Sequence, residues 1–178
     1  MALSRPPPMP VPVPIVDEVL VPERPADAAV VERLIARAFG PGRFAKAVER
    51  LREGARLAPD VSFVAWRGTE PVGCVRLWPV SVGGKRGLLL GPIAVDASCR
   101  RQGVGAELVQ RACESAMAAG WAYVLLVGDA PFFGPLGFSP LPARGVRLPG
   151  PVDQGRVMVR ALTPGGDADL VGPVVPLA

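Results

Sequence analysis

Residues 88–105 read LLLGPIAVDASCRRQGVG, and the rest of the chain is organised around them. The stretch begins as an apolar run that closes at Val95, which is typical of a buried strand. A polar turn follows, and Gly103 and Gly105 then open a segment of helical periodicity. Its apolar residues are Val104, Leu108, Ala112, Ala116 and Ala119. The pattern predicts a strand, a loop and a helix, with two glycines at the start of the helix.

The predicted loop has the chemistry of a phosphate site. The first amides of a helix lack intrahelical partners and carry a partial positive charge, so they bind anions. Glycine at positions 103 and 105 lets a phosphate approach these amides closely. Arg100 and Arg101 add fixed positive charge. The sequence therefore predicts that this loop holds a phosphate.

Three known phosphate-binding loops compete for this stretch. A P-loop needs GxxxxGK[ST], and no Lys-Ser or Lys-Thr follows these glycines. A dinucleotide-binding loop needs GxGxxG directly after a strand, but here Leu108 holds the third glycine position and seven residues separate Val95 from Gly103. The third pattern, [R/Q]xxGx[G/A], belongs to the pyrophosphate loop of the GNAT N-acetyltransferases. Arg100, Gly103 and Gly105 match it.

Composition excludes several classes of site. The chain has no histidine, which excludes Ser-His-Asp and Cys-His catalysis and most transition-metal sites. Its three cysteines form no CxxC pair, so neither a disulfide framework nor a zinc site is expected. No metal is therefore expected to take part. A length of 178 residues suits one domain with a sizeable core.

Charge and hydropathy set the expectations for partners and location. The net charge of +4 is mild, and the arginines are scattered with little aromatic interleaving, so we expect no nucleic-acid partner. Prolines and glycines interrupt every apolar run below the length of a membrane span. The proline-rich start lacks the apolar core of a signal peptide, so a soluble, cytoplasmic protein without membrane contact is expected.

The remaining periodicities give a mixed α/β order. We expect a proline-rich disordered leader over residues 1–16, one domain over 17–163 and a loose tail over 164–178. Within the domain the patterns predict helices at 25–39, 44–56, 104–120 and 132–136, strands at 61–67, 72–82, 88–95, 121–127 and 156–162, a strand start at 137–138 and a loop at 140–155. Pro92 cannot donate to a strand ladder, so pairing should bulge at Gly91 and Pro92. Long apolar strands predict a mixed sheet with helices on both faces.

Three further segments match the same family as the loop. Residues 38–43 read AFGPGR, residues 90–95 read LGPIAV, and residues 128–133 read GDAPFF, followed by Gly137 and Phe138. Together with the loop, they resemble the GNAT acetyltransferase superfamily over about residues 17–162, and within it the YhbS-type N-acetyltransferases. The resemblance implies a central, mostly antiparallel mixed sheet that is splayed at an acyl-CoA site.

The resemblance also implies acetyl-CoA as co-substrate and an amine, from a small molecule or a protein, as acceptor. Transfer would occur by direct attack in a ternary complex. A backbone N–H near Val95 would polarise the thioester carbonyl. The residues expected to hold the cofactor are Ile93, Ala94, Val95, Arg100, Arg101, Gln102, Gly103, Val104, Gly105, Ala106 and Phe133. Many members of the family dimerise, so a homodimer is an expectation from the family alone.

The chain departs from the family at the acid and the base. Many members carry a tyrosine proton donor where this chain has Phe133, and the one tyrosine, Tyr123, lies in a predicted strand. The strand at 88–95 carries no ionisable residue that could serve as base. Asp129 is the remaining catalytic candidate, although the N-cap of the following short helix is the favoured interpretation. An acyl-CoA-binding module with little or no transfer activity therefore stays open as the alternative.

For Cys99, and for Arg43 with Lys46, the sequence leaves a functional and a structural interpretation open. Cys99 precedes the arginines, where a reactive thiolate is conceivable, but an incidental loop cysteine is the favoured interpretation. Arg43 and Lys46 fall in the segment that covers the acceptor site in this family. They would either attract an acidic acceptor or form a solvated face.

Overall fold

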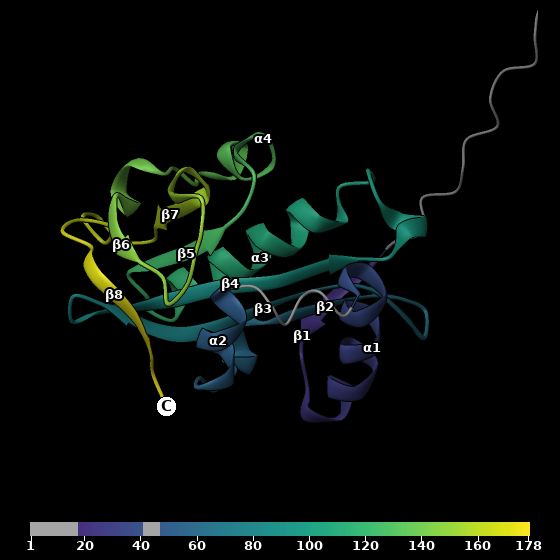
Figure 1. Cartoon of the computed structure of the whole chain (residues 1–178). Coiled ribbons are helices and arrows are strands. Elements are labelled where there is room, and N and C mark those ends of the chain that lie inside the picture. Colours follow the sequence, from purple (N-terminus) through teal and green to yellow (C-terminus); the bar gives the residue numbers. More distant parts are fainter. Residues whose placement is uncertain (1–17, 41–46) are drawn as a thin grey trace, which may run out of the picture.

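A mixed sheet forms the middle layer of the protein in the computed structural model, which describes residues 18–40 and 47–178 (Figure 1). Its main path runs through six strands that lie side by side in the order β1 (Val19–Pro22), β2 (Phe63–Arg67), β3 (Glu70–Val82), β4 (Lys85–Val95), β5 (Tyr123–Val127) and β7 (Val157–Ala161). These neighbours are antiparallel except β4 and β5, which run parallel. The predicted mixed, mostly antiparallel sheet is confirmed.

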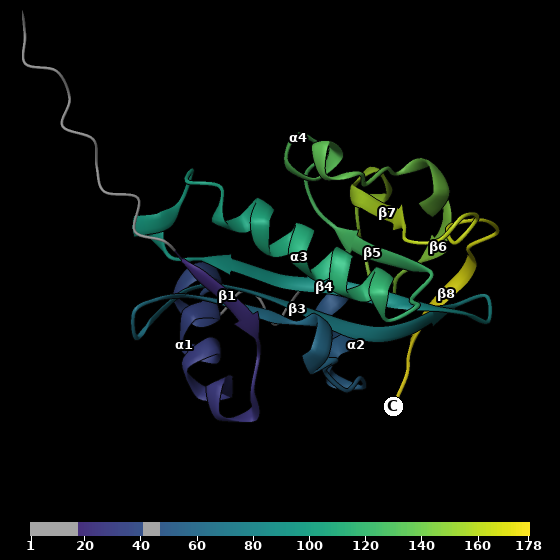
Figure 2. The same ribbon diagram turned by 180° about the vertical axis from the view of Figure 1, so that it is seen from behind.

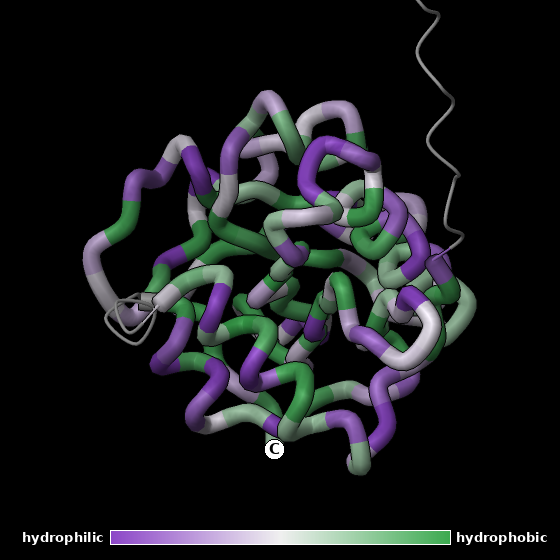
Figure 3. Tube along the Cα trace, turned by 90° about the vertical axis from the view of Figure 1, so that its right-hand side faces the viewer, coloured by the Kyte–Doolittle hydropathy of each residue, from purple (hydrophilic) through white to green (hydrophobic). Residues whose placement is uncertain are grey.

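Helices cover both faces of this sheet. The helices α1 (Ala28–Phe39) and α2 (Ala47–Glu53) lie on one face, and α3 (Val104–Ala118) lies on the other, as the views from the front and from behind agree (Figures 1 and 2). The short helix α4 (Ala130–Phe133) follows β5. Hydrophobic residues gather along the middle of the trace, between the layers (Figure 3). The apolar strands are therefore buried on two faces, as their composition predicts.

Each helix packs through the apolar stripe that its sequence carries. Leu34 and Ile35 of α1 are buried against Val64, Cys74 and Ala94 of the sheet. On the opposite face, α3 packs onto the sheet through its own apolar stripe. The buried residues of that stripe are Val104, Leu108, Val109, Ala112, Cys113 and Ala116. Packing of these faces supplies most of the stability of the helices.

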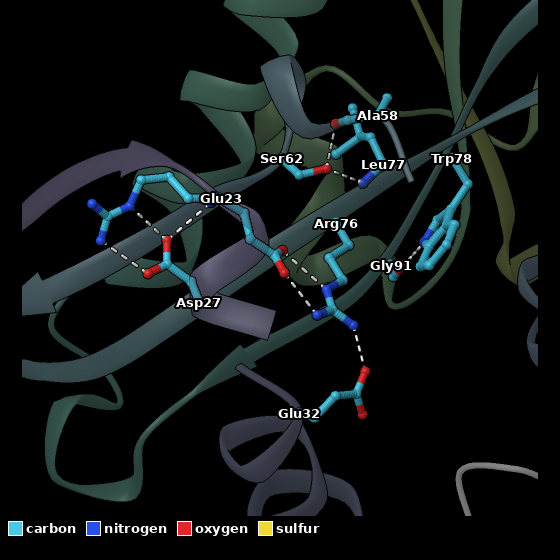
Figure 4. Close-up of polar contacts among 10 residues, drawn as sticks. Glu23, Asp27, Glu32, Ala58, Ser62, Arg76, Leu77, Trp78 and Gly91 are labelled. Carbon is cyan, nitrogen blue, oxygen red and sulfur yellow. Dashed lines mark hydrogen bonds and ion pairs between the residues drawn. The ribbon is translucent and has the colours of Figure 1, made fainter. Parts of the chain in front are cut away.

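The ladder between β3 and β4 changes register at the predicted position. Val75 lies opposite Ile93, whereas Leu77 lies opposite Leu90, so the pairing is shifted where Gly91 and Pro92 occur. The missing N–H of proline explains why the bulge forms there. The indole Nε1 of Trp78 donates a hydrogen bond of 2.6 Å to the carbonyl of Gly91, which supports the bulged backbone (Figure 4).

The expectation of a loose tail after residue 163 is wrong. The strand β8 (Val171–Pro176) pairs antiparallel with the end of β3 and parallel with β6 (Gly145–Arg147). Prolines at 173 and 176 hide this strand from the sequence pattern, and β6 lies within the segment expected to be a loop. The strand expected from Gly137 is reduced to one bridge, between Ser139 and Val159.

Three other expectations fall partly or wholly outside the described residues. The described part of the second predicted helix is α2, and residues 44–46 of the prediction are not described. The leader at 1–16 also lies outside the described residues, as do Arg43 and Lys46.

A buried ionic cluster ties the edge of the sheet and α1 to the bulge. Arg76, which is 6% exposed, donates through Nη2 and Nε to the carboxylate of Glu23 at 2.7 and 3.0 Å. It also donates through Nη1 to Glu32 of α1 (Figure 4). Burial opposes the charge of Arg76, but the hydrogen bonds that it donates to the carboxylates of Glu23 and Glu32, and the attraction of their charges, outweigh burial and raise the pKa of the guanidinium. The cluster connects the end of β1, α1 and β3 through charged groups, and the buried charges of Arg76 and Glu23 each need the other as counter-charge.

Candidate active site

The sheet opens between its two parallel strands. β4 and β5 pair only at Leu88 with Val124 and at Leu89 with Leu125. Beyond this point β4 continues to Val95 and stays paired with β3, while β5 ends at Val127. The edge of β4 over residues 90–95 therefore has no strand partner from the described part of the chain on the side of β5. This is the splay that the resemblance to the family implies.

One cleft, here called the α3 cleft, lies between this open edge and the start of α3. It has a volume of about 410 Å³. Gly103 is the N-cap of α3 with φ of 84°, and a Cβ there would meet no atom within 4 Å. The residues that line the cleft include Ile93, Val95, Arg100, Arg101, Gly103, Val104, Gly105, Ala106, Phe132 and Phe133. The cleft therefore joins the first amides of a long helix to two guanidinium groups.

Hydrogen bonds hold the loop before α3 in place. The carboxylate of Asp96 accepts from the backbone N–H and the hydroxyl of Ser98, at 3.0 and 2.7 Å, and these bonds lower the pKa of Asp96. Nε2 of Gln102 donates to the carbonyl of Ser98 at 3.2 Å, and Nη2 of Arg67 donates to Oε1 of Gln102 at 3.3 Å. The loop is thus tied to itself and to the end of β2 before any ligand binds.

The residues of the α3 cleft fit coenzyme A. Backbone amides and the two arginines at the start of α3 match a pyrophosphate in charge and in hydrogen bonding. Ile93, Phe132 and Phe133 form an apolar wall that would suit the pantetheine arm. The open edge of β4 would offer backbone groups to the amides of that arm.

A second cleft, here called the α2 cleft, lies on the other side of the bulge and has a volume of about 550 Å³. Its charged lining residues are Arg50, Arg52, Arg156, Asp129 and Asp153, and its apolar ones include Phe39, Val48, Leu90, Pro92, Leu126, Val127 and Val152. Its walls thus come from α1, α2, β4, the end of β5 and the segment around η7 (Gln154–Arg156).

The bulge leaves room for one of these arginines. Gly91 has φ of 139°, and a Cβ placed on it would lie 2.4 Å from Nη2 of Arg52. Nη1 of Arg52 lies 2.7 Å from Oε2 of Glu49, and both side chains are 13% exposed. Glycine at this position therefore lets a guanidinium lie directly against the backbone of β4.

The two clefts share a boundary. Ile93, Asp129 and Phe133 line both of them. A ligand that lies along β4 in the α3 cleft and a ligand in the α2 cleft would therefore meet at these three side chains.

The side chain of Asp129 is not the helix cap that the sequence favours. Asp129 holds the N-cap position of α4, and its backbone carbonyl accepts from the amides of Phe132 and Phe133 at 3.1 and 2.9 Å. Its carboxylate makes no capping bond and instead lies 3.3 Å from Nη2 of Arg156. The side chain lines the shared boundary and is 74% exposed, so its ion pair with Arg156 is weak.

Aromatic hydroxyls take no part in either cleft. Phe133 is 7% exposed, and its ring packs edge-to-face on Phe132 and Phe138 with centroid distances of 4.7 and 5.8 Å. Tyr123, the only tyrosine, is fully buried and donates its hydroxyl to the carbonyl of Lys85 at 2.9 Å. Burial raises the pKa of Tyr123 to about 12. The proton donor that many relatives carry thus has no tyrosine counterpart here.

Most of the residues expected to hold the cofactor do line the α3 cleft, with two differences. Ala94 is buried on the opposite face of β4, against α1, because successive strand residues alternate in direction. The side chain of Gln102 turns back onto its own loop. Phe132 also lines the cleft, and its position next to Phe133 could have indicated it. Residues 150–153 belong to a proline- and glycine-rich stretch and Arg156 begins a predicted strand, so neither carries a sequence signal for a site.

The three cysteines are buried, and Cys99 lies at the wall of the α3 cleft. Cys74, Cys99 and Cys113 are each 0% exposed, and burial raises the pKa of Cys74 to about 12 and that of Cys113 to about 11. We expect no rapid reaction of the native protein with an aromatic disulfide reagent, and three reactive thiols in denaturant. One rapidly reacting thiol in the native protein would contradict this burial. If the protein thiols do not react, the same reagent detects only the thiol of released CoA and can be used to follow transfer.

Within residues 18–40 and 47–178, no helix is long and apolar enough to cross a membrane. The same ranges contain no group of three or more Cys, Asp or Glu side chains placed to hold a metal ion.

Comparisons with known proteins agree with this geometry. Residues 29–132 match the model of the acetyltransferase (GNAT) family. The N-acetyltransferase YhbS of Escherichia coli K12 is 32% identical over 119 residues, which are 66% of this chain and 71% of that protein. The crystal structure of E. coli YhbS in complex with CoA superposes with a TM-score of 0.78 at 28% identity, covering 93% of this chain and 92% of that one. A GNAT acetyltransferase of Brucella melitensis in complex with acetyl-CoA, 23% identical, shares the fold with a TM-score of 0.65, covering 92% of this chain and 97% of that one.

Proposed function

Because the chain belongs to the GNAT acetyltransferase family, we propose that it is an acetyl-CoA-dependent N-acetyltransferase acting by direct attack in a ternary complex. The observation that carries the proposal is the boundary of Ile93, Asp129 and Phe133, which is common to both clefts. The α3 cleft would take acetyl-CoA, and the α2 cleft would take the amine. CoA in the crystal structure of E. coli YhbS supports the first assignment.

The backbone of β4 suits the activation of a thioester. The N–H of Asp96 donates to the carbonyl of Val72 in β3, at 2.8 Å. Successive N–H groups of a strand point to opposite sides, so the N–H of Val95 points away from β3 and into the splay. From there it would donate to the thioester carbonyl and stabilise the oxyanion that forms on attack. Arg100 Nε donates to the carbonyl of Val95 at 3.4 Å and steadies this end of the strand.

The proton balance of the transfer involves one side chain. The neutral amine attacks the carbonyl carbon, the C–S bond breaks, and the CoA thiolate leaves. The amine proton passes to the carboxylate of Asp129, which lies at the shared boundary. The thiolate takes a proton from solvent, since a thiol with an ordinary pKa of about 8.5 is a fair leaving group without a dedicated acid.

The experiment mixes the protein with isotope-labelled acetyl-CoA and a panel of amines. We expect N-acetylated amine and free CoA in equal amounts, with no acetyl group on the protein itself. Tight binding of acetyl-CoA without transfer to any amine would instead support the acyl-CoA-binding module, which Phe133 and the lack of an ionisable residue over 88–95 favour. Acetylated protein that passes its acetyl group to the amine would contradict direct attack.

Substitution Asp129→Asn tests the assigned base. We expect kcat to fall about 100-fold, because an amide cannot accept the amine proton. Thermal stability should stay within error, since the carboxylate is exposed and makes no capping bond. The measurement is the pH profile of kcat together with the melting temperature.

Asp153→Asn is the matched control for this test. Asp153 lines only the α2 cleft, and its carboxylate accepts from the amide of Gly155 at 3.0 Å. It should change kcat little, because it does not reach the shared boundary. Equal losses in both variants would show a general effect of charge and would remove Asp129 as base.

A further inference from the structure

The charges that line the α2 cleft are unequal. Three arginines, Arg50, Arg52 and Arg156, face two aspartates, Asp129 and Asp153. Asp153 is engaged with the backbone of η7, through its bond to the amide of Gly155. Asp129 lies beside Arg156. Because Asp129 is assigned to the reacting amine, a second ammonium group on the acceptor would meet the guanidinium groups of Arg50 and Arg156.

Two of the arginines are accessible to an anion. Arg156 and Asp129 form a single contact of 3.3 Å, and their side chains are 50% and 74% exposed. Exposed ion pairs of this kind contribute little, so a carboxylate of the substrate competes readily for the guanidinium. Arg50 is exposed, lines the cleft, and has no ion pair with any residue of 18–40 or 47–178. Arg52, by contrast, is held by Glu49 and shapes the wall.

The rest of the α2 cleft limits the size and polarity of the acceptor. Its volume of about 550 Å³ is in the range of small-molecule sites. Apolar side chains make up most of the remaining wall, and Val48, Leu126 and Val152 are among them. A small molecule with an apolar body and one anionic group matches such a wall.

On the basis of the proposed transferase function, we infer that the acceptor is a small amine that also carries a carboxylate, which Arg156 and Arg50 recognise. The guanidinium fork matches a carboxylate in geometry and charge. Polyamines and lysine-rich peptides carry further ammonium groups, which these arginines would repel, so they are poor acceptors.

The experiment compares matched acceptors that differ only in the carboxylate. Leucine, phenylalanine and aspartate are each tested against the corresponding α-carboxamide, with spermidine as a polycation, and kcat/KM is measured at saturating acetyl-CoA. We expect at least one of the three amino acids to exceed its amide by about tenfold or more. Higher kcat/KM for the amides or for spermidine would overturn the inference while leaving the transferase function in place.

A binding measurement makes the test independent of turnover. N-acetyl derivatives of the same acids and amides are titrated into the protein loaded with CoA. We expect at least one N-acetyl acid to bind more tightly than its amide, and binding of none of them would overturn the inference. Failure of CoA itself to bind would mark the failure of the proposed function.

Substitutions identify the arginines concerned. Arg156→Gln and Arg50→Gln should raise the KM for the preferred acid about tenfold and leave the KM for its amide nearly unchanged. Arg111→Gln is the matched control, because Arg111 is exposed on α3, lines neither cleft, and the substitution removes the same charge. An equal effect in the control, or an equal effect on acid and amide, would overturn the assignment.

Discussion

Substitution Gly105→Glu is expected to weaken binding of acetyl-CoA by about 100-fold while the protein stays folded. Gly105 lies in the first turn of α3, and a Cβ there would sit 3.5 Å from side-chain carbons of Phe132 and Val95. These are ordinary contacts, so the first side-chain atom fits. The carboxylate of the new side chain would then occupy the place of the pyrophosphate and repel it.

The stability of the variant separates this effect from misfolding. An acidic side chain in the first turn of a helix is favourable by about 0.3–1 kcal/mol, and glutamate replaces a residue of poor helix propensity. The melting temperature should therefore stay the same or rise. Calorimetric titration with acetyl-CoA, beside a thermal melt, gives both quantities.

Gly105→Gln is the matched control for charge. It has nearly the same volume as glutamate and carries no charge, so its loss of affinity should be much smaller. Equal losses for Gln and Glu would show that bulk alone blocks the cleft. Wild-type affinity in Gly105→Glu would mean that the pyrophosphate does not lie on the start of α3.

Substitution Arg76→Met is expected to lower the free energy of unfolding by about 3–5 kcal/mol. Arg76 and Glu23 are 6% and 4% exposed, and two hydrogen bonds join them (Figure 4). Removing the guanidinium leaves the carboxylate of Glu23 buried without a counter-charge, and its desolvation is then uncompensated. Urea unfolding followed by circular dichroism measures the loss.

Two companion variants test the cause. Replacing both partners, with Glu23→Leu and Arg76→Met, should recover most of the stability, because no charge is left buried. Glu32→Gln should cost less than about 1 kcal/mol, since the side chain of Glu32 is 47% exposed. A double variant as unstable as Arg76→Met would show that packing, and not the orphaned charge, explains the loss.

The sequence predicts well the elements whose conformation is determined by residues close together in the chain. The strand, loop and helix around Val95 and Gly103 follow from local periodicity and from glycine at the helix start. The bulge at Pro92 follows from a missing donor on that residue itself. The phosphate-binding part of the site consists mostly of backbone amides of one segment, so it could be predicted from that segment alone.

The α2 cleft could not be predicted in this way, because its walls come from distant segments. Arg50 lies on α2 and Arg156 at η7, and only the topology of the sheet brings them to the same cleft. The carboxylate of Asp129 could either accept a capping hydrogen bond from α4 or pair with a distant arginine. The sequence alone does not show which of these two interactions forms. The strand β8 was missed because Pro173 and Pro176 suggest irregular structure, whereas the strand carries prolines within its pairing with β3 and β6.

The most direct test of the central claim is calorimetric titration of the wild-type protein with acetyl-CoA. The open edge of β4 and the amides at the start of α3 predict one site per chain with a micromolar Kd. The titration is run at two temperatures, because the enthalpy of binding can pass through zero at one of them. No heat of binding at either temperature, up to about 1 mM acetyl-CoA, would contradict the assignment of the α3 cleft.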